Sequence, residues 1–262
     1  RPGYDIISQA MGGLMSITGQ EGDPPTRCGS AMGDVLGGLN LTIGVLAALH
    51  ARQVTGKGQY VDVSIADSVV LSLEQAWQRY FVTGYVPKPH GNYYDAIAPY
   101  DSYQAKDGWL VIGCGNQKLY ELLCTKILKQ PELITDERFT TVPLRVKNNK
   151  EFKKIMENWL KDYTVDEAVD ILLGVGIPAG PILNVEQIAH DEHFAKAREL
   201  FIPIEHPVCG EVILNGNAVK MSDTKASLRM PAPTLGQHNA LIMEKLGYSK
   251  EEIDRLVAEG VL

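Results

Sequence analysis

The stretch Gly29-Ser30-Ala31-Met32-Gly33-Asp34-Val35-Leu36-Gly37-Gly38 places one carboxylate among small residues, just before a run with helical spacing. The apolar positions of that run recur at three- and four-residue steps: Val35, Leu36, Leu39, Ile43, Leu46, Ala47 and Leu49. They predict a helix from about Val35 to Ala51. Asp34 then lies at the N-cap or in the first turn, where free N–H groups and the positive end of the helix dipole favour an ionised carboxylate.

Two interpretations of Asp34 stay open on these residues alone. An aspartate just before a helix is most often a cap that accepts a backbone N–H. The alternative is a functional carboxylate, because Gly29, Gly33, Gly37 and Gly38 leave room for a ligand to approach the backbone. Asp34 is the only candidate in the sequence that combines a plausible chemistry with a preorganised setting.

The composition is that of an ordinary globular protein. Of its 262 residues, 45% are hydrophobic and 22% are charged, which suits one large or two modest domains. The net charge of −7 comes without a basic tract and argues against a nucleic-acid partner. No apolar run approaches the roughly 20 residues that span a bilayer, so we expect no membrane segment. The four cysteines form no CxxC pair, and with no signal peptide visible they indicate reduced thiols in a cytoplasmic protein.

The first third of the chain mixes helix and strand signals. Residues 4–18 are apolar and small and predict a short buried helix that ends near Gly12-Gly13 or near Gly19. Residues 59–65 alternate apolar and polar side chains, which predicts a strand with one buried face. A second helix is expected from Asp67, as its cap, to about Val82. Helix, strand and helix at this spacing predict an α/β layered domain.

The middle of the chain differs in texture. Residues 83–99 are rich in proline and tyrosine and predict a long irregular segment, of a length that is usually functional or disordered. Residues 100–105 and 109–113 predict a hairpin. Helices follow at 118–128, at 148–161, after the capping box Thr164–Glu167, and at 185–199, with a rigid connector at 177–181. We interpret residues 85–199 as a smaller α+β domain.

The C-terminal part returns to strand character. Residues 209–214 and 218–221 flank Asn215-Gly216-Asn217, which predicts a hairpin with its turn at these three residues. A helix is expected from Asn239 to about Leu246. The capping box Ser249–Glu252 opens a final helix.

Other candidate sites are better explained structurally. His190 and His193 lack zinc-helix spacing, and a surface turn is favoured over a metal site, so we predict no metal. Gly113-Cys114-Gly115-Asn116 follows a strand and precedes a helix, where a tight turn is favoured over an anion site. His238 stands at a helix start and is expected to make a structural hydrogen bond.

Several segments, in this order, resemble the class III CoA-transferases, which include formyl-CoA and carnitine CoA-transferases (the CaiB/BaiF family). The resemblance covers essentially the whole chain and rests on these segments: Arg1-Pro2-Gly3-Tyr4-Asp5, Gln9-Ala10, Gly33-Asp34, Thr55-Gly56-Lys57-Gly58-Gln59-Tyr60-Val61-Asp62-Val63-Ser64, Ala98-Pro99-Tyr100, Asp107-Gly108, Arg145-Val146-Lys147-Asn148, Gly176-Ile177-Pro178-Ala179-Gly180-Pro181, His206-Pro207-Val208-Cys209-Gly210 and Ala232-Pro233-Thr234-Leu235-Gly236-Gln237-His238. Each segment alone is weak evidence for the resemblance, whereas the occurrence of all of them in this order is specific to the family.

The resemblance implies a fold and a division of the chain. The family fold is α/β: a Rossmann-like large domain, an inserted small α+β domain and a C-terminal return to the large domain. Here 1–84 and 200–262 would belong to the large domain and 85–199 to the small one. The chain has no initiator Met, and the resemblance favours a fragment, because family members carry a preceding half with most CoA contacts. The CoA-binding residues are therefore unknown. It also implies an interlocked homodimer, or association with that half.

The resemblance further assigns roles to residues. Asp34 falls on the catalytic aspartate, and Tyr4 and Asp5 on positions lining the acid-substrate pocket, beside Gly33, Gly37 and Gly38. The related α-methylacyl-CoA racemases carry a histidine where this chain has Tyr4, so a racemase is the weaker alternative. A truncated, non-catalytic homologue is another. The formyl-CoA enzyme covers its site with a run of four glycines and a glutamine; here that loop has only Gly91, which argues against oxalate or formate.

The reaction implied is transfer of CoA from an acyl-CoA to a carboxylic acid. The Asp34 carboxylate would form an anhydride with the acyl group and then a thioester with CoA. CoA and acyl-CoA would be substrates, and no permanently bound cofactor is expected. Because a carboxylate is a weak nucleophile, alignment and exclusion of water must supply most of the acceleration. We also expect backbone N–H groups near Gly37 and Gly38 to hold the developing oxyanion.

Overall fold

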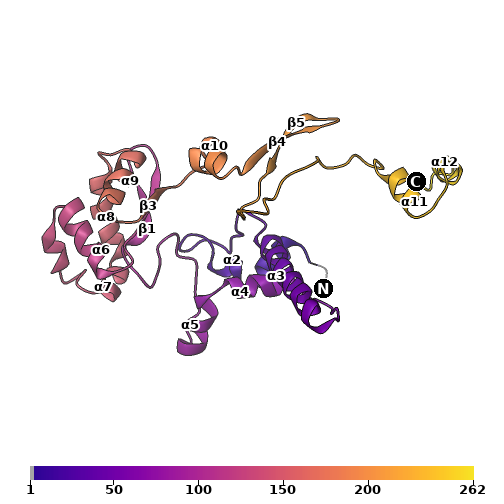
Figure 1. Ribbon diagram of the computed structural model, residues 1–262. Coiled ribbons are helices and arrows are strands. Elements are labelled where there is room, and N and C mark those ends of the chain that lie inside the picture. Colours follow the sequence, from indigo (N-terminus) through magenta and orange to yellow (C-terminus); the bar gives the residue numbers. More distant parts are fainter. Residues whose placement is uncertain (1–2) are drawn as a thin grey trace. The chain divides into compact units, whose positions relative to one another are not determined.

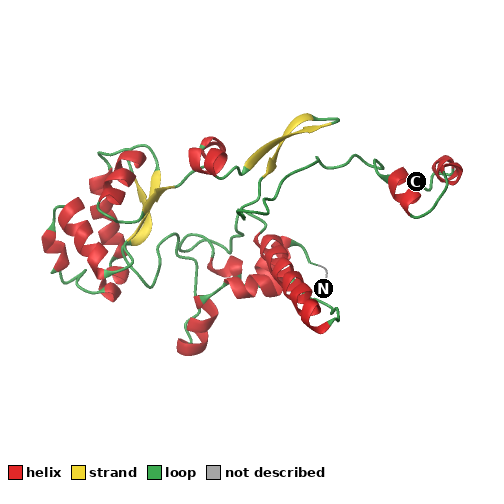
Figure 2. Cartoon of the chain, in the orientation of Figure 1, coloured by secondary structure: helices red, strands yellow, loops and turns green. Residues whose placement is uncertain are grey.

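The computed structural model describes residues 3–262 and divides into two compact units, residues 1–182 and 183–262. The first unit contains α1 (Asp5–Met11), α2 (Leu14–Ile17), α3 (Met32–Thr55), α4 (Ile65–Ser72), α5 (Gln75–Thr83), β1 (Tyr100–Gln104), β2 (Trp109–Gly113), α6 (Gln117–Leu122), η1 (Leu123–Ile127), η2 (Pro131–Ile134), α7 (Val142–Lys147), α8 (Asn149–Leu160), α9 (Val165–Gly174) and β3 (Ala179–Pro181) (Figure 1). The second contains α10 (Val185–His190), η3 (Glu192–Ala197), β4 (Phe201–His206), β5 (Gly210–Asn215), α11 (Asn239–Lys245) and α12 (Lys250–Ala258). Helices are the more common element (Figure 2).

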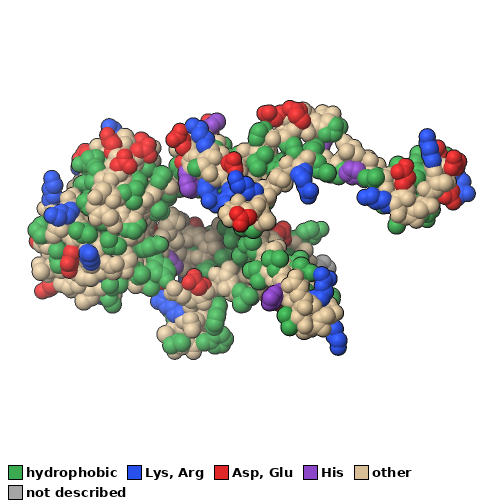
Figure 3. Space-filling model, in the orientation of Figure 1, with side chains coloured by type: hydrophobic (Ala, Val, Ile, Leu, Met, Phe, Trp, Pro, Cys, Tyr) green, Lys and Arg blue, Asp and Glu red, His purple; other side chains and the backbone are tan. Residues whose placement is uncertain are grey.

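The helix α3 is longer than the sequence predicted at both ends. It begins at Met32 and ends where Gly56 adopts φ 71°, a left-handed conformation whose N–H donates to the Arg52 carbonyl. Only Gly33 and Gly37 of its residues are buried, and apolar side chains gather on the surface over this part of the chain (Figure 3). With 24 residues, α3 is long and apolar enough to cross a membrane by length and composition. The expectation that no stretch approaches that length was therefore wrong, because interspersed Gly, Asn and Thr interrupt the apolar run without making it polar.

The strand predicted at residues 59–65 is not formed. These residues are extended, but no strand of the described chain pairs with them, and α4 begins at Ile65. Alternation fixes which side chains share a face, but a strand also needs a partner for its backbone groups. The cap of α4 is Ser64, whose hydroxyl accepts the Asp67 N–H, so the cap lies three residues before the predicted one.

The expected second helix is broken into two. Glu74, at φ 49°, separates α4 from α5. The helix predicted within residues 4–18 is α1, which ends at Gly12, one of its two predicted ends, and Gly13 at φ 86° separates it from α2. It is not buried as predicted, because Ile6, Ile7 and Met11 are 50%, 43% and 57% exposed and only Ser8 and Gln9 are buried. A positive φ strains a residue that has a side chain, such as Glu74. The local sequence therefore gives no signal for the break between α4 and α5.

The hydrophobic core of the first unit lies between residues 103 and 179. The predicted hairpin is confirmed: β1 and β2 pair antiparallel from Tyr100–Gly113 to Gln104–Trp109. The connector predicted at 177–181 supplies a third strand, β3, beside β2. The buried side chains come from the sheet and the helices on it: Tyr103, Leu110, Ile112, Tyr120, Leu123, Phe139, Phe152, Met156, Leu160, Ala168, Leu172 and Ile177. The four-residue spacing of Phe152, Met156 and Leu160 turns one face of α8 inward.

Arg145 is buried in this core, with 1% of its surface exposed. Its Nε donates to the Ala98 carbonyl at 2.8 Å, and an Nη1 N–H donates to the Phe139 carbonyl at 2.9 Å. The guanidinium lies 4.1 Å from the centre of the Tyr120 ring. Arg145 therefore fastens the end of the irregular 84–99 segment to the core through carbonyl oxygens and an aromatic face.

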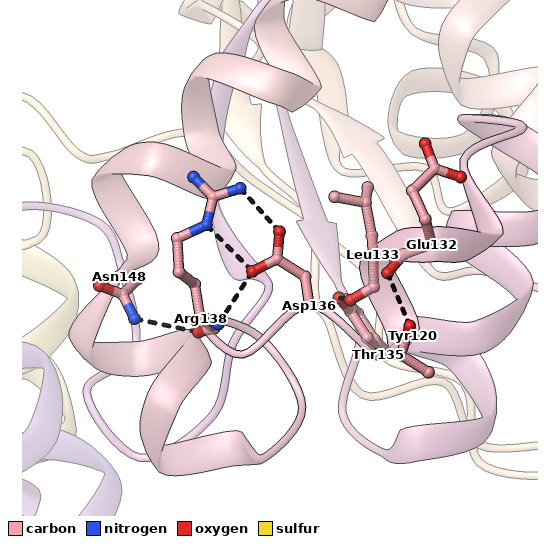
Figure 4. A network of polar contacts seen from close by, with 7 residues as sticks. All are labelled: Tyr120, Glu132, Leu133, Thr135, Asp136, Arg138 and Asn148. Atoms are coloured by element: carbon pink, nitrogen blue, oxygen red, sulfur yellow. Dashed lines mark hydrogen bonds and ion pairs between the residues drawn. The ribbon is translucent and has the colours of Figure 1, made fainter.

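Short-range polar contacts shape the turns around this core. The Tyr120 hydroxyl donates to the Leu133 carbonyl at 2.8 Å, and the Asn148 amide donates to the Arg138 carbonyl at 3.0 Å (Figure 4). The Asp136 carboxylate accepts from the backbone and guanidinium of Arg138 at 2.7–3.0 Å. These hydrogen bonds lower the pKa of Asp136 to about 2. These contacts hold η2 and the turn at residues 136–141, which leads into α7.

The hairpin of the second unit was predicted in the wrong place. β4 and β5 pair from Phe201–Asn215 to His206–Gly210, so the turn lies at residues 207–209. There His206 Nδ1 accepts the N–H groups of Val208 and Cys209, both at 3.2 Å, and Gly210 adopts φ 70°. Gly216, the expected turn residue, instead donates its N–H to the Leu200 carbonyl. The capping boxes at Thr164 and Ser249 are confirmed as the starts of α9 and α12.

The fold is a mixture of helices and sheets, as predicted. Both sheets of residues 3–262 are antiparallel: a three-stranded sheet of order β1-β2-β3 and the two-stranded β4-β5. The Rossmann-like arrangement and the division into 1–84, 85–199 and 200–262 stay predictions.

Candidate active site

The site is built around the first turn of α3. Ala31 is the N-cap residue and offers no side-chain cap. The capping function comes from α1 instead: the Asp5 Oδ1 accepts the Gly33 N–H at 2.9 Å. A carboxylate at this end of a helix also interacts favourably with the helix dipole. Asp5 therefore caps α3 from a distance of 28 residues in the sequence.

Asp34 lies in this first turn, as predicted, but does not cap the helix. Its side chain is exposed, and none of residues 3–262 forms a hydrogen bond or ion pair with its carboxylate. The capping interpretation of Asp34 is therefore wrong, because Asp5 already occupies the Gly33 N–H. A free carboxylate in the positive field of a helix start is available for chemistry.

The glycines around Asp34 differ in what they contact. A Cβ on Gly33 would lie 2.1 Å from Ser8 Oγ, and one on Gly37 would lie 2.7 Å from Ile65 Cγ2. Their small size is thus required by packing of α1 and α4 against α3. A Cβ on Gly38 or Gly29 would meet nothing within 4 Å. The open side of the helix lies at Gly38, while a ligand-lining role for Gly33, Gly37 and Gly38 stays a prediction.

The expected oxyanion donors near Gly37 and Gly38 are not available. Because α3 begins at Met32, these residues lie beyond its first turn, where backbone N–H groups donate to carbonyls four residues back. The first such bond runs from the Val35 N–H to the Ala31 carbonyl at 3.0 Å. Of the first-turn N–H groups, that of Met32 donates to the Ser30 carbonyl and that of Gly33 to Asp5.

Tyr4 and Asp5, the other predicted pocket residues, have different surroundings. Tyr4 is 79% exposed at the N-cap of α1. Asp5 is half-buried, and its second carboxylate oxygen accepts the Gln9 Nε2 N–H at 2.8 Å. Asp5 thus holds the protein's own backbone and amide groups. Sequence reasoning missed both contacts; the four-residue spacing of Asp5 and Gln9 on one helix face was an available signal for the contact with Gln9 alone.

The other motifs singled out in the sequence give no evidence of a binding site. In Gly113-Cys114-Gly115-Asn116, the Cys114 N–H donates to the Pro99 carbonyl and the Asn116 side chain caps α6 by accepting the Leu119 N–H. His238 precedes α11 without a side-chain capping bond, so the expected structural bond at that cap is not formed. Within residues 3–262 no group of three or more His, Cys, Asp or Glu side chains could hold a metal ion, and His190 ends α10.

A cavity of about 620 Å³, which no sequence signal indicated, lies beside the three-stranded sheet. Its walls include Tyr100, Val111, Leu119 and Pro178. They are mostly apolar, with Asp101 at one side already paired to Lys153 at 3.2 Å. The cavity belongs to the same unit as Asp34.

Comparison with known proteins identifies the family. Residues 1–239 match the model of the family described as CoA-transferase family III. Succinyl-CoA:glutarate CoA-transferase of Mus musculus is 37% identical over 263 residues, covering 100% of this chain and 60% of the relative. Succinyl-CoA–D-citramalate CoA-transferase of Chloroflexus aurantiacus is 34% identical, covering 100% and 65%. Acetyl-CoA:oxalate CoA-transferase of Acetobacter aceti is 37% identical, covering 93% and 61%.

A solved structure agrees with these relatives. The crystal structure of a CaiB/BaiF family protein from Brucella suis superimposes with a TM-score of 0.78 at 34% identity, covering 94% of this chain and 63% of that one. The chain spans 60–65% of the length of the three curated relatives described above. Because the family match runs through most of the chain, this protein is a member of CoA-transferase family III.

Proposed function

We propose that this chain supplies the nucleophile, Asp34, of an enzyme that moves CoA from an acyl-CoA to a carboxylic acid. The observation that carries the proposal is the exposed Asp34 carboxylate, which stands in the first turn of α3 with no partner among residues 3–262. The names of the relatives, all CoA-transferases, support the reaction type.

The proposed reaction proceeds through two covalent forms of Asp34. A carboxylate oxygen attacks the thioester carbonyl carbon of the donor, the C–S bond breaks, and CoA leaves as a thiolate. The thiolate then attacks the Asp34 carbonyl carbon of the resulting anhydride and expels the donor acid as a carboxylate, leaving an Asp34–CoA thioester. The acceptor carboxylate attacks the carbonyl carbon of this thioester, the C–S bond breaks to release the thiolate again, and a second anhydride joins Asp34 to the acceptor. The thiolate finally attacks the acceptor acyl carbon, which yields the new acyl-CoA and restores Asp34.

The substrates we propose follow from the relatives. Two of the three relatives are named for succinyl-CoA, with glutarate and D-citramalate, and the third is named for acetyl-CoA and oxalate. Each of these three acids carries two carboxylates, one to react and one to be recognised. We propose succinyl-CoA as donor and a small dicarboxylate as acceptor.

We propose that parts of the site lie outside this chain. Because the chain spans 60–65% of these relatives, we propose that further polypeptide, from the same protein or from an interlocked second subunit, supplies most CoA contacts. We also propose that the protein works in the cytoplasm and uses CoA only as a substrate.

The first prediction tests Asp34 directly. In the full-length protein, Asp34→Asn keeps the shape of the side chain but removes the nucleophile, and we expect turnover of succinyl-CoA with glutarate to fall at least about 1,000-fold. Hydroxylamine added during turnover should convert Asp34 to its hydroxamate, which peptide mass spectrometry detects. Exposed Asp23→Asn is the matched control and should keep its activity.

Three outcomes would contradict this proposal. Asp34→Asn with near-normal turnover would exclude Asp34 as the nucleophile. A wild-type protein that binds CoA without transferring it would indicate a non-catalytic homologue. Exchange of the hydrogen next to the thioester carbonyl, without transfer, would favour the racemase alternative.

A further inference from the structure

Behind the start of α3 lies a set of hydrogen bonds that the proposed reaction does not use, and it centres on Gln9. This side chain is fully buried, at 0% exposure. Its Nε2 donates to Asp5 Oδ2 at 2.8 Å and to the Ser30 carbonyl at 3.1 Å. Its Oε1 accepts the Cys28 N–H at 2.9 Å. Every polar atom of the amide therefore has a partner, which is the state a buried polar group requires.

These bonds fix the loop that leads into α3. Residues 28–31 form neither strand nor helix, and α3 begins at Met32. Gln9 holds the loop at Cys28 and Ser30, and Asp5 holds Gly33 in the first turn of α3. The other hydrogen bonds of the loop are local, such as the Met32 N–H donating to the Ser30 carbonyl at 2.9 Å. Helix α1 thus determines where the loop runs and where α3 begins.

We propose that Gln9 is a positioning residue for the reaction at Asp34. By tying the 28–31 loop to α1, it sets the direction in which the first turn of α3 presents the Asp34 carboxylate. This inference rests on the proposed function of Asp34. A weak nucleophile depends on alignment, and a displacement of about 1 Å can cost about 100-fold in rate.

The test replaces the amide without changing its length. In the full-length protein, Gln9→Glu loses both donated hydrogen bonds and brings a second carboxylate beside Asp5. We expect kcat to fall about 30-fold and KM for the acyl-CoA to change less than about threefold, because the chemistry loses alignment while the binding surface stays. Trapping of Asp34 by hydroxylamine should slow by the same factor as kcat. The matched control Gln53→Glu, at an exposed position of α3, should stay within about twofold of the wild type.

A rescue variant separates positioning from mere loss of stability. In Asp5→Asn/Gln9→Glu the carboxylate and amide are exchanged, so that residue 5 donates to residue 9 and still accepts the Gly33 N–H. We expect kcat to recover at least about fivefold over Gln9→Glu, since one hydrogen bond to a charged group is restored. The single variant Asp5→Asn completes the double-mutant cycle.

The outcomes distinguish this inference from the proposed function. If Gln9→Glu matches Gln53→Glu, or changes KM alone, Gln9 does not position the nucleophile. A double variant that recovers nothing contradicts it too. Should Gln9→Glu fail to fold, Gln9→Met, which removes the same bonds without adding charge, gives the same comparison. Asp34→Asn that retains turnover overturns the proposed function instead, whatever the Gln9 variants do.

Discussion

The regions 3–83 and 100–181 belong to one unit, but they differ in how far their apolar side chains are buried. Residues 100–181 enclose a continuous core in which Tyr120, Phe139 and Phe152 are fully buried. In residues 3–83 the one large hydrophobic side chain that is buried is Val69, whereas Leu39 and Ile43 are 57% and 64% exposed.

The region that supplies most of the buried core is therefore not the region that carries Asp34. The region with a core can derive its free energy of unfolding from buried apolar area. The region that carries Asp34 relies on the Asp5 and Gln9 hydrogen bonds and on close contacts at Gly33 and Gly37. Its geometry is therefore set by few interactions, each of which matters for the position of the first turn of α3.

The largest stability effect should come from the core. Phe152→Ala removes a ring that packs on Tyr120 and Phe139, with ring centres 5.7 and 5.3 Å away. We expect it to lower the free energy of unfolding by about 3–5 kcal/mol. Urea titration followed by circular dichroism measures this loss in the 262-residue chain.

The matched change in the other region is Leu39→Ala. At an exposed position of α3 it should alter the free energy of unfolding of this chain by less than about 0.5 kcal/mol. A loss as large as that of Phe152→Ala would break the contrast, because it would show that the face of α3 at Leu39 is covered in solution.

Two neighbouring glycines of α3 allow the same comparison, between a packed position and an open one, within a single helix. Gly37→Ala places a methyl group 2.7 Å from Ile65 Cγ2 and should destabilise the chain by about 1–3 kcal/mol. Gly38→Ala meets nothing within 4 Å and should stabilise it by up to about 1 kcal/mol, since alanine favours a helix over glycine. Thermal unfolding of the two variants should shift in opposite directions. Equal shifts would mean that α4 does not pack on α3 at Gly37.

The last contrast is a dependence of stability on pH in the core. Burial raises the pKa of the Cys114 thiol from 9.0 to about 12, so the folded state keeps the proton that the unfolded state loses. This contribution is complete below pH 9 and disappears as pH rises towards 12, by up to about 1.4 kcal/mol per pH unit. Cys114→Ala should flatten the decline of unfolding free energy above pH 9, whereas exposed Cys209→Ala should leave the slope unchanged. Identical slopes in both variants would place the ionising group elsewhere.

Features with local causes were predictable from the sequence. The caps at Thr164 and Ser249 need only residues within one helical turn, and both formed. The hairpin of β1 and β2 likewise depends on a short turn, because Gln104 pairs with Trp109 only five residues later. The position of Asp34 in a first turn followed from the spacing of apolar residues after it.

Features that depend on distant partners were not predictable. Residues 59–65 have strand alternation but no partner strand in the described chain. The second hairpin turned at residues 207–209 because His206 Nδ1 accepts two N–H groups there, which outweighs the Asn215-Gly216-Asn217 pattern. The distant capping of α3 by Asp5 joins residues 28 apart, and no local pattern announces it.

The surroundings of Arg145 have a consequence for acid conditions. Its charge rests on two carbonyl oxygens and an aromatic face, and none of these gains a proton in mild acid. Burial lowers the pKa of Arg145, yet a guanidinium starts so high that it stays charged. The 84–99 segment should thus remain fastened at Ala98 on acidification. The Lys150–Glu21 pair, by contrast, releases once its carboxylate is neutralised.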